Sequence, residues 1–464
     1  MGARGWGLLT LVTMLVGAVA FCGAWMVTRG DRELRALLQS RGVVPLLPPP
    51  RQDPRRVALG RSLFFDRILS GNRDIACATC HDPAHGFGDE LRLSVGTGGT
   101  GRGPERRVGE GRRPIGRHAP SLLNRGSPGW HTFFWDGRVG GRPGDFSSKL
   151  PLPGGLDHLL AAQALFPITN RDEMRGHPGD RDVHGKPNEL ASFHGEKESA
   201  KLWTAIMRRL LAIEEYRGMF RAAYPEVRAD QFGIQHVLNA LAAYQIDTTN
   251  RMDTPFDRYL LGDDRALQPA ARHGASLFYG PAGCYECHSG PLHTDQRFHN
   301  LAVPQIGSKG NCTNCHGPRH ADEAGGVAVG TADFGRFVET KKEEDRFGFR
   351  TPPLRNVALT APYMHDGTID TLEQAVRHHL EPSRSLAQRL KALEKEEGIH
   401  LVFEPARQKI MLQSLDARLS PDRPLTDAEV ADLVAFLEAL TDAGAGGGYD
   451  LPERVPSGLP VVDP

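Results

Sequence analysis

The chain has 464 residues, enough for two or three domains. Its 56 basic and 56 acidic residues cancel, and this balance argues against a nucleic-acid partner. Glycine (53) and proline (34) are abundant, so long loops should outnumber strands.

The N-terminus begins with Arg4 and an apolar run, Trp6–Val27. The run is close to the ~20 residues that span a bilayer, and no clear small-residue cleavage site follows it. Residues 1–30 are therefore predicted to be an uncleaved membrane anchor, with a cleaved export signal as the alternative. Residues 31–54 combine a short helix with a proline-rich linker, which either spaces the protein from the membrane or wraps over the fold.

The pentad Cys-x-x-Cys-His occurs three times, at Cys77–His81, Cys284–His288 and Cys312–His316. This spacing is the signature of covalent c-type haem attachment. The two thiols bind the haem vinyl groups and the adjacent imidazole ligates the iron. Of the seven cysteines only Cys22 lies outside the pentads, so no pair remains for a disulfide.

Two haems c are therefore expected, and a third stays open. The attachment residues are Cys77, Cys80 and His81, then Cys284, Cys287 and His288, and, for the open third site, Cys312, Cys315 and His316. At the third site the alternative is a loop whose cysteines remain thiols or pair together. Because haem attachment to cysteine takes place outside the cytoplasm, we expect a periplasmic protein tethered to the inner membrane by its N-terminal helix.

A loop at residues 95–117 is rich in arginine. Two interpretations remain open for it: a solvated surface loop, or a docking patch for an acidic electron donor. The arginines are Arg102, Arg106, Arg107, Arg112, Arg113 and Arg117.

Helical periodicity dominates from residue 200 onward. Apolar spacing predicts helices over Lys201–Tyr224 and Gln231–Ile246, and a capping box at Thr426–Glu429 starts a final helix. The two halves of the sequence have the same order of elements: a helix, a pentad, a long loop and further helices. This order predicts a mainly α fold of tandem cytochrome c-like haem domains with long loops, plus the N-terminal membrane-anchor helix.

Several further stretches have a recognisable pattern around the pentads. They are Cys77–His81, Ala119–Asn124, Phe134–Arg138, Asn170–Met174, Cys284–Pro291, Thr351–Thr360 and Ala361–Gly367. On these stretches, residues 55–442 resemble the bacterial di-haem cytochrome c peroxidase family, and within it the MauG-like branch. The resemblance implies an N-terminal peroxidatic domain at 55–250 and a C-terminal electron-transfer domain at 251–445. The third pentad is an insertion at 308–330, and residues 446–464 are expected to form a flexible tail.

The resemblance also implies the residues around the first haem. Family members that need reductive activation close this haem with a histidine in Ser-x-Gly-His-Gly, where this chain has Thr97 in Ser94–Gly98. Threonine is a poor iron ligand, so the first haem is expected to be open. Splitting an O–O bond requires moving a proton between the two oxygens. The resemblance assigns this task to Glu173, a distal amide position to Gln163, and an electron relay between the haems to Trp135.

At the second haem, the family places the sixth ligand fourteen residues after the histidine that is His365 here, which gives His379. Other members have methionine or tyrosine at this position. A helix-starting box, Thr371–Gln374, independently puts His379 on the apolar face of its helix. We therefore expect ligation by His288 and His379, with Met364 as the alternative ligand.

A calcium ion commonly bridges the two halves in this family. Thr360 and Pro362 match the positions that donate backbone carbonyls, but the side-chain position is His118. Imidazole is a poor ligand for a hard cation, so calcium remains an open alternative.

Three functions fit the sequence. The leading hypothesis is a peroxidase that reduces hydrogen peroxide to water at the open first haem, with electrons from a small cytochrome, a cupredoxin or a quinol passing through the second haem. The second is a MauG-like oxidase that uses peroxide to modify a tryptophan or tyrosine of a partner protein. The third is a non-enzymatic multihaem electron carrier, which requires every haem to be six-coordinate.

Overall fold

The computed structural model describes residues 30–193, 198–308, 332–396, 399–402, 405–419, 424–449 and 451–461. The anchor predicted at Trp6–Val27 and the third pentad, Cys312–His316, lie outside these residues. Among the helices of the described ranges, none combines the length and the apolar character needed to cross a membrane.

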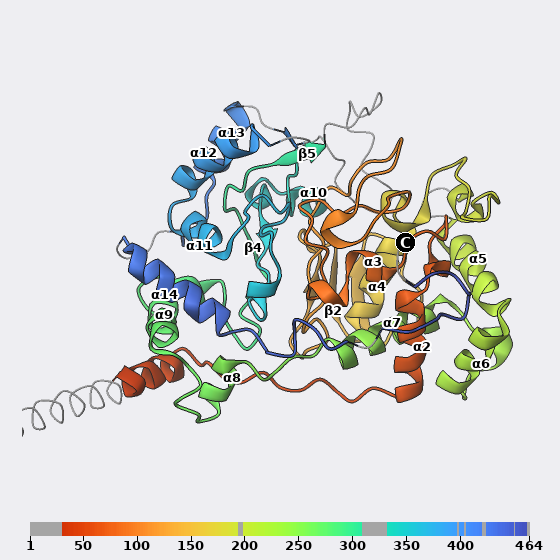
Figure 1. Cartoon of the computed structure of the whole chain (residues 1–464), viewed down its shortest axis with the longest axis horizontal. Coiled ribbons are helices and arrows are strands. Elements are labelled where there is room, and N and C mark those ends of the chain that lie inside the picture. Colours follow the sequence, from red (N-terminus) through yellow and green to blue (C-terminus); the bar gives the residue numbers. More distant parts are fainter. Residues whose placement is uncertain are drawn as a thin grey trace, which may run out of the picture.

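Helices dominate the structure, and the strands are few and short (Figure 1). The helices are α2 (Pro54–Phe65), α3 (Cys77–Cys80), α4 (Leu159–Thr169), α5 (Ser199–Leu211), α6 (Glu214–Ala223), α7 (Ile234–Thr248), α8 (Pro255–Leu260), α9 (Pro269–Tyr279), α10 (Phe337–Thr340), α11 (Leu372–Leu380), α12 (Pro382–Leu393), α13 (Pro405–Gln413) and α14 (Asp427–Glu438). Residues 30–40 form a further helix.

The strands form small antiparallel sheets. They are β1 (Thr132–Phe133), β2 (Val139–Arg142), β3 (Asp145–Ser148), β4 (Phe298–His299), β5 (Ile306–Ser308), β6 (Phe349–Arg350) and β7 (Ile399–Leu401). Strands β1, β2 and β3 form one sheet in that order, while β4 pairs with β6 and β5 with β7. In the β4–β6 pair Phe298 lies opposite Arg350, and the amide of Arg350 donates to the carbonyl of Trp135 at 2.7 Å. This bond joins the two halves of the chain.

Each half is built around one close helix crossing that follows the same sequence pattern. In the first half α2 packs on α7, and in the second α9 packs on α14. A Cβ atom on Gly60 of α2 would lie 1.9 Å from the carbonyl oxygen of Ala240, and one on Gly274 of α9 would lie 1.9 Å from that of Asp432. Both glycines begin a Gly-x-Ser-Leu-Phe stretch that leads towards a pentad. The predicted tandem of similar helical units is therefore visible in the packing.

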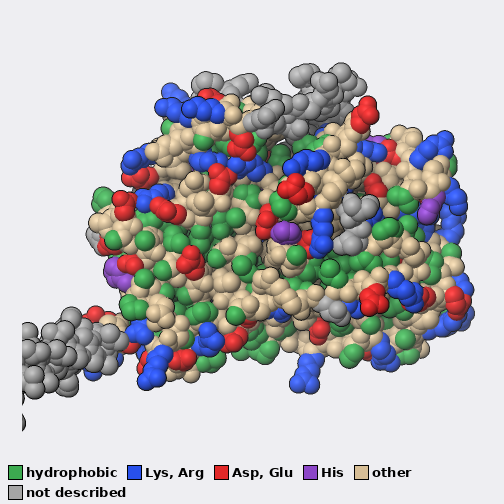
Figure 2. All heavy atoms as spheres, viewed as in Figure 1, with side chains coloured by type: hydrophobic (Ala, Val, Ile, Leu, Met, Phe, Trp, Pro, Cys, Tyr) green, Lys and Arg blue, Asp and Glu red, His purple; other side chains and the backbone are tan. Residues whose placement is uncertain are grey.

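The predicted helices are present, with one break. The helix expected over Lys201–Tyr224 is divided, because α5 ends at Leu211 and α6 begins at Glu214. The final helix starts where its capping box predicted, and the Thr426 hydroxyl accepts the amide of Glu429 at 3.3 Å. Basic and acidic side chains are scattered over the face in Figure 2, in keeping with the net charge of zero.

Both terminal segments wrap across the fold (Figure 1). Leu34 and Leu38 of the first described helix are buried in the core of the second half, and the proline-rich segment then runs to α2 in the first half. At the other end, Ser457 donates its hydroxyl to the buried carboxylate of Asp66 at 2.6 Å. The described residues around Ser457 therefore pack on the first half, so this part of the segment 446–464 is not the flexible tail expected there.

A buried ion network also holds the two halves together. Arg117 of the first half lies 2.6 Å from Asp136 and 2.7 Å from Asp333 of the second half. Burial alone would raise the pKa of Asp136, but Arg138 and Arg117 hold it well below its usual range. The arginine is thus paired on both sides and couples the halves.

Replacing Arg117 by methionine should destabilise the protein by about 3–5 kcal/mol, because it leaves buried carboxylates without their partner. Guanidinium unfolding of the haem-loaded protein measures this, with the exposed Arg107→Met as the control. The pKa of Asp136 lies below its unfolded value of about 3.9, so its contribution exists above that pH and is lost as the pH falls through the folded pKa. Equal stability of the Arg117→Met and Arg107→Met variants would contradict the stabilising role of the Arg117 ion pairs.

The arginine-rich loop differs from both interpretations of its sequence. Arg112 pairs with Asp180 at 2.8 Å and Arg113 with Asp172 at 2.5 Å. Arg106 is buried and donates to three backbone carbonyls of its own loop. These three arginines attach the loop to the first half. They are therefore neither fully solvated nor free to form a basic docking surface.

Candidate functional site

The first pentad opens onto a cavity in the first half. Cys77, Cys80 and His81 form part of its lining. The Nδ1 atom of His81 lies 3.1 Å from the carbonyl oxygen of Phe87, so this nitrogen donates and Nε2 keeps its lone pair. Burial lowers the pKa of His81 to about 4, which keeps the imidazole in the neutral form that ligates a metal.

Two of the predicted catalytic residues share this cavity. Gln163 comes from α4, and Glu173 comes from the single turn η4 (Arg171–Arg175) that follows it. The side chain of Asn170 starts this turn, because its Oδ1 accepts the amides of Asp172 at 2.8 Å and Glu173 at 3.1 Å. The structure therefore brings a carboxyl group and an amide to the same cavity as His81.

The loop Ser94–Gly98, which carries Thr97, lies beside this turn. Thr97 is buried, and its hydroxyl donates to Asp74 at 2.8 Å and accepts from Asn72 at 3.0 Å. Its amide donates to the carbonyl of Glu173 at 2.9 Å. Thr97 thus positions the loop against η4 and is absent from the cavity lining.

Trp135 lies between two cavities and contributes to the lining of both. Its indole nitrogen donates to the carbonyl of His118 at 3.1 Å, and its own carbonyl accepts the amide of Arg350. The first bond holds the indole and the second holds the backbone of Trp135, and its role as a relay stays a prediction.

The second pentad opens onto the other cavity. Cys284 and Cys287 line it with His288, whose Nδ1 atom lies 3.1 Å from the carbonyl oxygen of His293. Burial lowers the pKa of His288 to about 4, as it does for His81. The two proximal histidines are therefore held in the same way, each by a backbone carbonyl a few residues further along the chain.

His379 enters the second cavity from α11, on the face that the sequence predicted. Its Nδ1 atom lies 2.8 Å from the carbonyl oxygen of Ala375, which leaves Nε2 for a ligand. The ring centres of His288 and His379 are 6.2 Å apart. A ligating imidazole nitrogen lies about 2 Å from its metal and the ring centre about 1 Å further, so two imidazoles on one ion have centres about 6 Å apart.

The neighbouring candidates for the second iron ligand in this cavity are less suited to that role than His379. His378 is fully buried, and its two ring nitrogens contact the Ser385 hydroxyl at 3.0 Å and the Leu301 carbonyl at 2.8 Å. Met364 does reach the second cavity, so both ligands considered from the sequence line it. The spacing of the two imidazoles favours His379.

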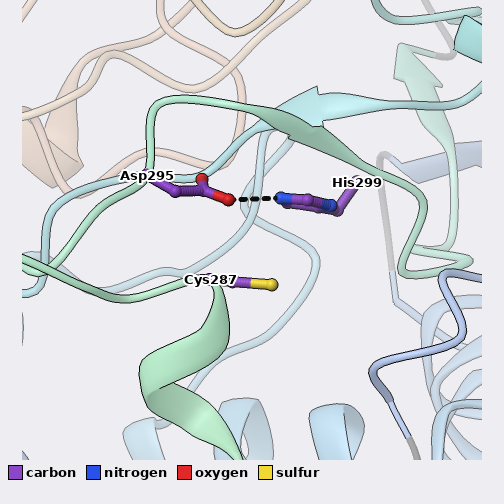
Figure 3. A group of neighbouring side chains, drawn as sticks. All are labelled: Cys287, Asp295 and His299. Carbon is purple, nitrogen blue, oxygen red and sulfur yellow. Dashed lines mark hydrogen bonds and ion pairs between the residues drawn. The ribbon is translucent and has the colours of Figure 1, made fainter. Parts of the chain in front are cut away.

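A group of polar side chains that the sequence did not reveal borders the second cavity (Figure 3). The ligand atoms of Cys287, Asp295 and His299 lie within 4.8 Å of one another. His299 bonds Asp295 at 2.9 Å and Asp416 at 2.7 Å. Burial alone would lower the pKa of His299, but these carboxylates and Cys287 raise it to about 10. Each ring nitrogen of His299 thus faces a carboxylate, which favours a protonated imidazole within a buried charge network.

The calcium positions come from both halves of the chain. Thr360 and Pro362 follow the turn η10 (Val357–Leu359), and the amide of His118 donates to the carbonyl of His365 at 2.9 Å. The ring of His118 directs Nδ1 at the carbonyl of Leu91, 2.7 Å away. Calcium at this place stays a prediction.

The residues of both cavities fit a c-type haem. Each cavity offers two thiols and one neutral imidazole with a free nitrogen, and most of its remaining lining is apolar. His81 and His288 would bind the iron, and the paired cysteines would bind the porphyrin edge.

Comparisons with known proteins agree with this arrangement. The family description "Di-haem cytochrome c peroxidase" matches residues 54–265. Methylamine utilization protein MauG of Methylorubrum extorquens is 29% identical over 93% of this chain and 96% of its own. Cytochrome c551 peroxidase of Pseudomonas aeruginosa is 31% identical over 68% of this chain and 69% of its own. The crystal structure of a variant of the diheme peroxidase BthA from Burkholderia thailandensis has a TM-score of 0.56 at 25% identity, covering 88% of this chain and 90% of its own.

These relatives are named as peroxidases and as a MauG protein. A peroxidase-type oxidoreductase with two haems c follows from this agreement. The chain belongs to the di-haem cytochrome c peroxidase family.

Proposed function

We propose that the protein is a periplasmic peroxidase that reduces hydrogen peroxide to water in the first cavity, with electrons arriving through the second. One observation carries the proposal: Glu173 and Gln163 line the same cavity as His81, while Thr97 is held by Asp74 and Asn72 away from it. The carboxyl group of Glu173, which can transfer protons, therefore lies in the cavity where His81 would bind iron. The loop Ser94–Gly98 does not supply a second iron ligand there.

A haem held by His81 would supply this cavity with an iron that can bind peroxide and deliver electrons to it. Reduction of hydrogen peroxide consumes two protons and two electrons and yields two waters. Glu173 would take a proton from one peroxide oxygen and return it to the other, which leaves as water. Gln163 orients the peroxide by hydrogen bonding. His81 is held by the Phe87 carbonyl, which keeps its free nitrogen directed into the cavity.

The second cavity serves electron transfer in this proposal. His288 and His379 would both bind the iron of a haem in this cavity, which would leave no place for peroxide. Trp135, which lines both cavities, relays electrons between them. The donor is a small cytochrome, a cupredoxin or a quinol outside the cytoplasm, where haem attachment takes place.

Replacing Trp135 by phenylalanine should slow electron transfer between the haems, because the indole and its bond to the His118 carbonyl are lost. Stopped-flow mixing of the reduced protein with peroxide measures the rate at which the second haem is oxidised. Trp203→Phe, in α5 and outside both cavity linings, is the matched control. An unchanged rate in the Trp135→Phe variant would show that Trp135 does not relay electrons between the haems.

A second candidate is a MauG-like oxidase that modifies a tryptophan or tyrosine of a partner protein. Gln163 in the cavity and threonine at position 97 favour it, and the relative named MauG covers most of this chain. Substrate identity separates the two. Rapid turnover with a reduced cytochrome or quinol supports the peroxidase, and an oxidised side chain on a partner supports the oxidase.

Several finer features complete the proposal. The peroxidatic domain is residues 55–250 and the electron-transfer domain is 251–445. An N-terminal anchor would tether the protein to the inner membrane. A third haem at Cys312–His316 would add an entry point for electrons, and calcium would bridge the halves near Thr360. Protein mass, which counts the attached haems, and elemental analysis for calcium test the last two.

A further inference from the structure

Two fully buried arginines lack an acidic partner. Arg125 is 4% exposed relative to a free residue and Arg350 is 2% exposed. In the described part of the chain, neither guanidinium has a carboxylate within ion-pair distance. Their polar contacts are backbone carbonyls: Arg125 donates to Ser121 at 2.9 Å, and Arg350 donates to Phe134 at 2.9 Å and Thr351 at 3.1 Å. Arg117, by contrast, is buried between two carboxylates.

Two buried guanidinium groups without a carboxylate partner destabilise the folded state. Moving a charge out of water without a partner of opposite charge is strongly unfavourable, even after the surrounding protein relaxes. The two guanidinium groups also repel each other. Burial lowers the pKa of Arg125 well below its usual range and that of Arg350 to about 10, although Asp136 and Asp295, beyond ion-pair distance, raise the pKa of Arg350 in part. A fold that keeps both cations therefore needs a negatively charged group beside them.

The position of each arginine indicates which group this is. Arg125 lines the first cavity and Arg350 lines the second. Both guanidinium groups lie against the indole of Trp130, 4.8 Å and 5.2 Å from its ring centre. The pair thus stands where the two cavities approach each other, with one cation at each. A haem carries two propionate carboxylates on one edge, and the planar guanidinium fork matches a carboxylate in shape and charge.

We propose that Arg125 binds a propionate of the haem in the first cavity and Arg350 a propionate of the haem in the second. The inference rests on the haem placement given under the proposed function. Each arginine then neutralises a buried carboxylate and adds a fixed positive charge near its iron. This charge favours the reduced iron, so each arginine raises the reduction potential of its own haem. Trp130 and the backbone carbonyls of Ser121, Phe134 and Thr351 hold the two cations apart.

Redox titration of the haem-loaded protein tests the assignment, with the high-spin and low-spin signals distinguishing the two haems. Arg125→Gln should lower the potential of the first haem most, and Arg350→Gln that of the second. Arg125→Lys and Arg350→Lys keep the charge and should stay close to the wild-type values. Arg107→Gln, an exposed arginine of the first half, is the control for a general change of charge.

Other results would overturn the inference. These are unchanged potentials in both glutamine variants, or lysine variants that shift as far as the glutamine ones. Loss of peroxide turnover in Arg125→Gln without a shift in potential would assign that arginine to the substrate instead. If the glutamine variants fail to mature, infrared redox difference spectra of wild-type protein with isotope-labelled propionates decide. Ionised, strongly hydrogen-bonded carboxylates are expected, and protonated ones would contradict the pairing. Haem count and spin state test the proposed function separately.

Discussion

Replacing Glu173 by glutamine should lower peroxide turnover by ~100-fold or more while the haem content stays the same. Glutamine has nearly the same shape and still hydrogen-bonds, but it cannot take a proton from one peroxide oxygen and return it to the other. The backbone of η4 is fixed by the Asn170 side chain, which the substitution does not touch. Steady-state turnover and pyridine haemochrome spectra measure the two quantities in one preparation.

Glu105→Gln provides the control, because this carboxylate is exposed in the arginine-rich loop and lies outside both cavity linings. Its turnover should equal that of the wild type. A Glu173→Gln variant with normal turnover would remove this residue from the mechanism, and a variant without haem would show that Glu173 serves assembly.

Replacing His379 by alanine should convert the second haem from low spin to high spin. The ring centres of His288 and His379 are separated by the distance that a shared metal requires, and both side chains line the second cavity. Electron paramagnetic resonance of the oxidised variant should show two high-spin species. The potential of the second haem should also change, because an axial ligand is lost.

Met364→Leu is the matched variant, since Met364 is the other ligand candidate in the same cavity. It should keep the low-spin signal of the second haem. The reverse pattern, with the low-spin signal lost in Met364→Leu and kept in His379→Ala, would assign the sixth ligand to the methionine.

Much of the site follows from local sequence. The pentads place two thiols and an imidazole on one turn, and the box at Thr371 sets the helical face of His379. Glu173 and Gln163 reach the first cavity, as the family pattern implied, because α4 and η4 follow each other directly. The repeated Gly-x-Ser-Leu-Phe stretch is local too, but its meaning becomes clear only in the structure, where glycine permits the close helix crossings at Gly60 and Gly274.

What the sequence did not reveal depends on partners far along the chain. The role of Arg117 is set by Asp333, and that of His299 by Asp416, and no local pattern joins such residues. Two arginines of the loop 95–117 likewise pair with acidic residues far along the chain, Asp172 and Asp180. The tail from Ala443 is rich in glycine and proline, yet Ser457 donates to a buried carboxylate at Asp66. Arg125 and Arg350 show their lack of a partner only once the fold is known.

The most direct test of the account is electron paramagnetic resonance of the oxidised full-length protein, with a mass measurement of the attached haems. We predict a high-spin ferric signal from the haem on His81 and a low-spin signal with bis-imidazole character from the haem on His288. Low-spin iron alone, without any high-spin signal, would mean that a protein ligand closes the first haem, and would contradict peroxide reduction beside Glu173.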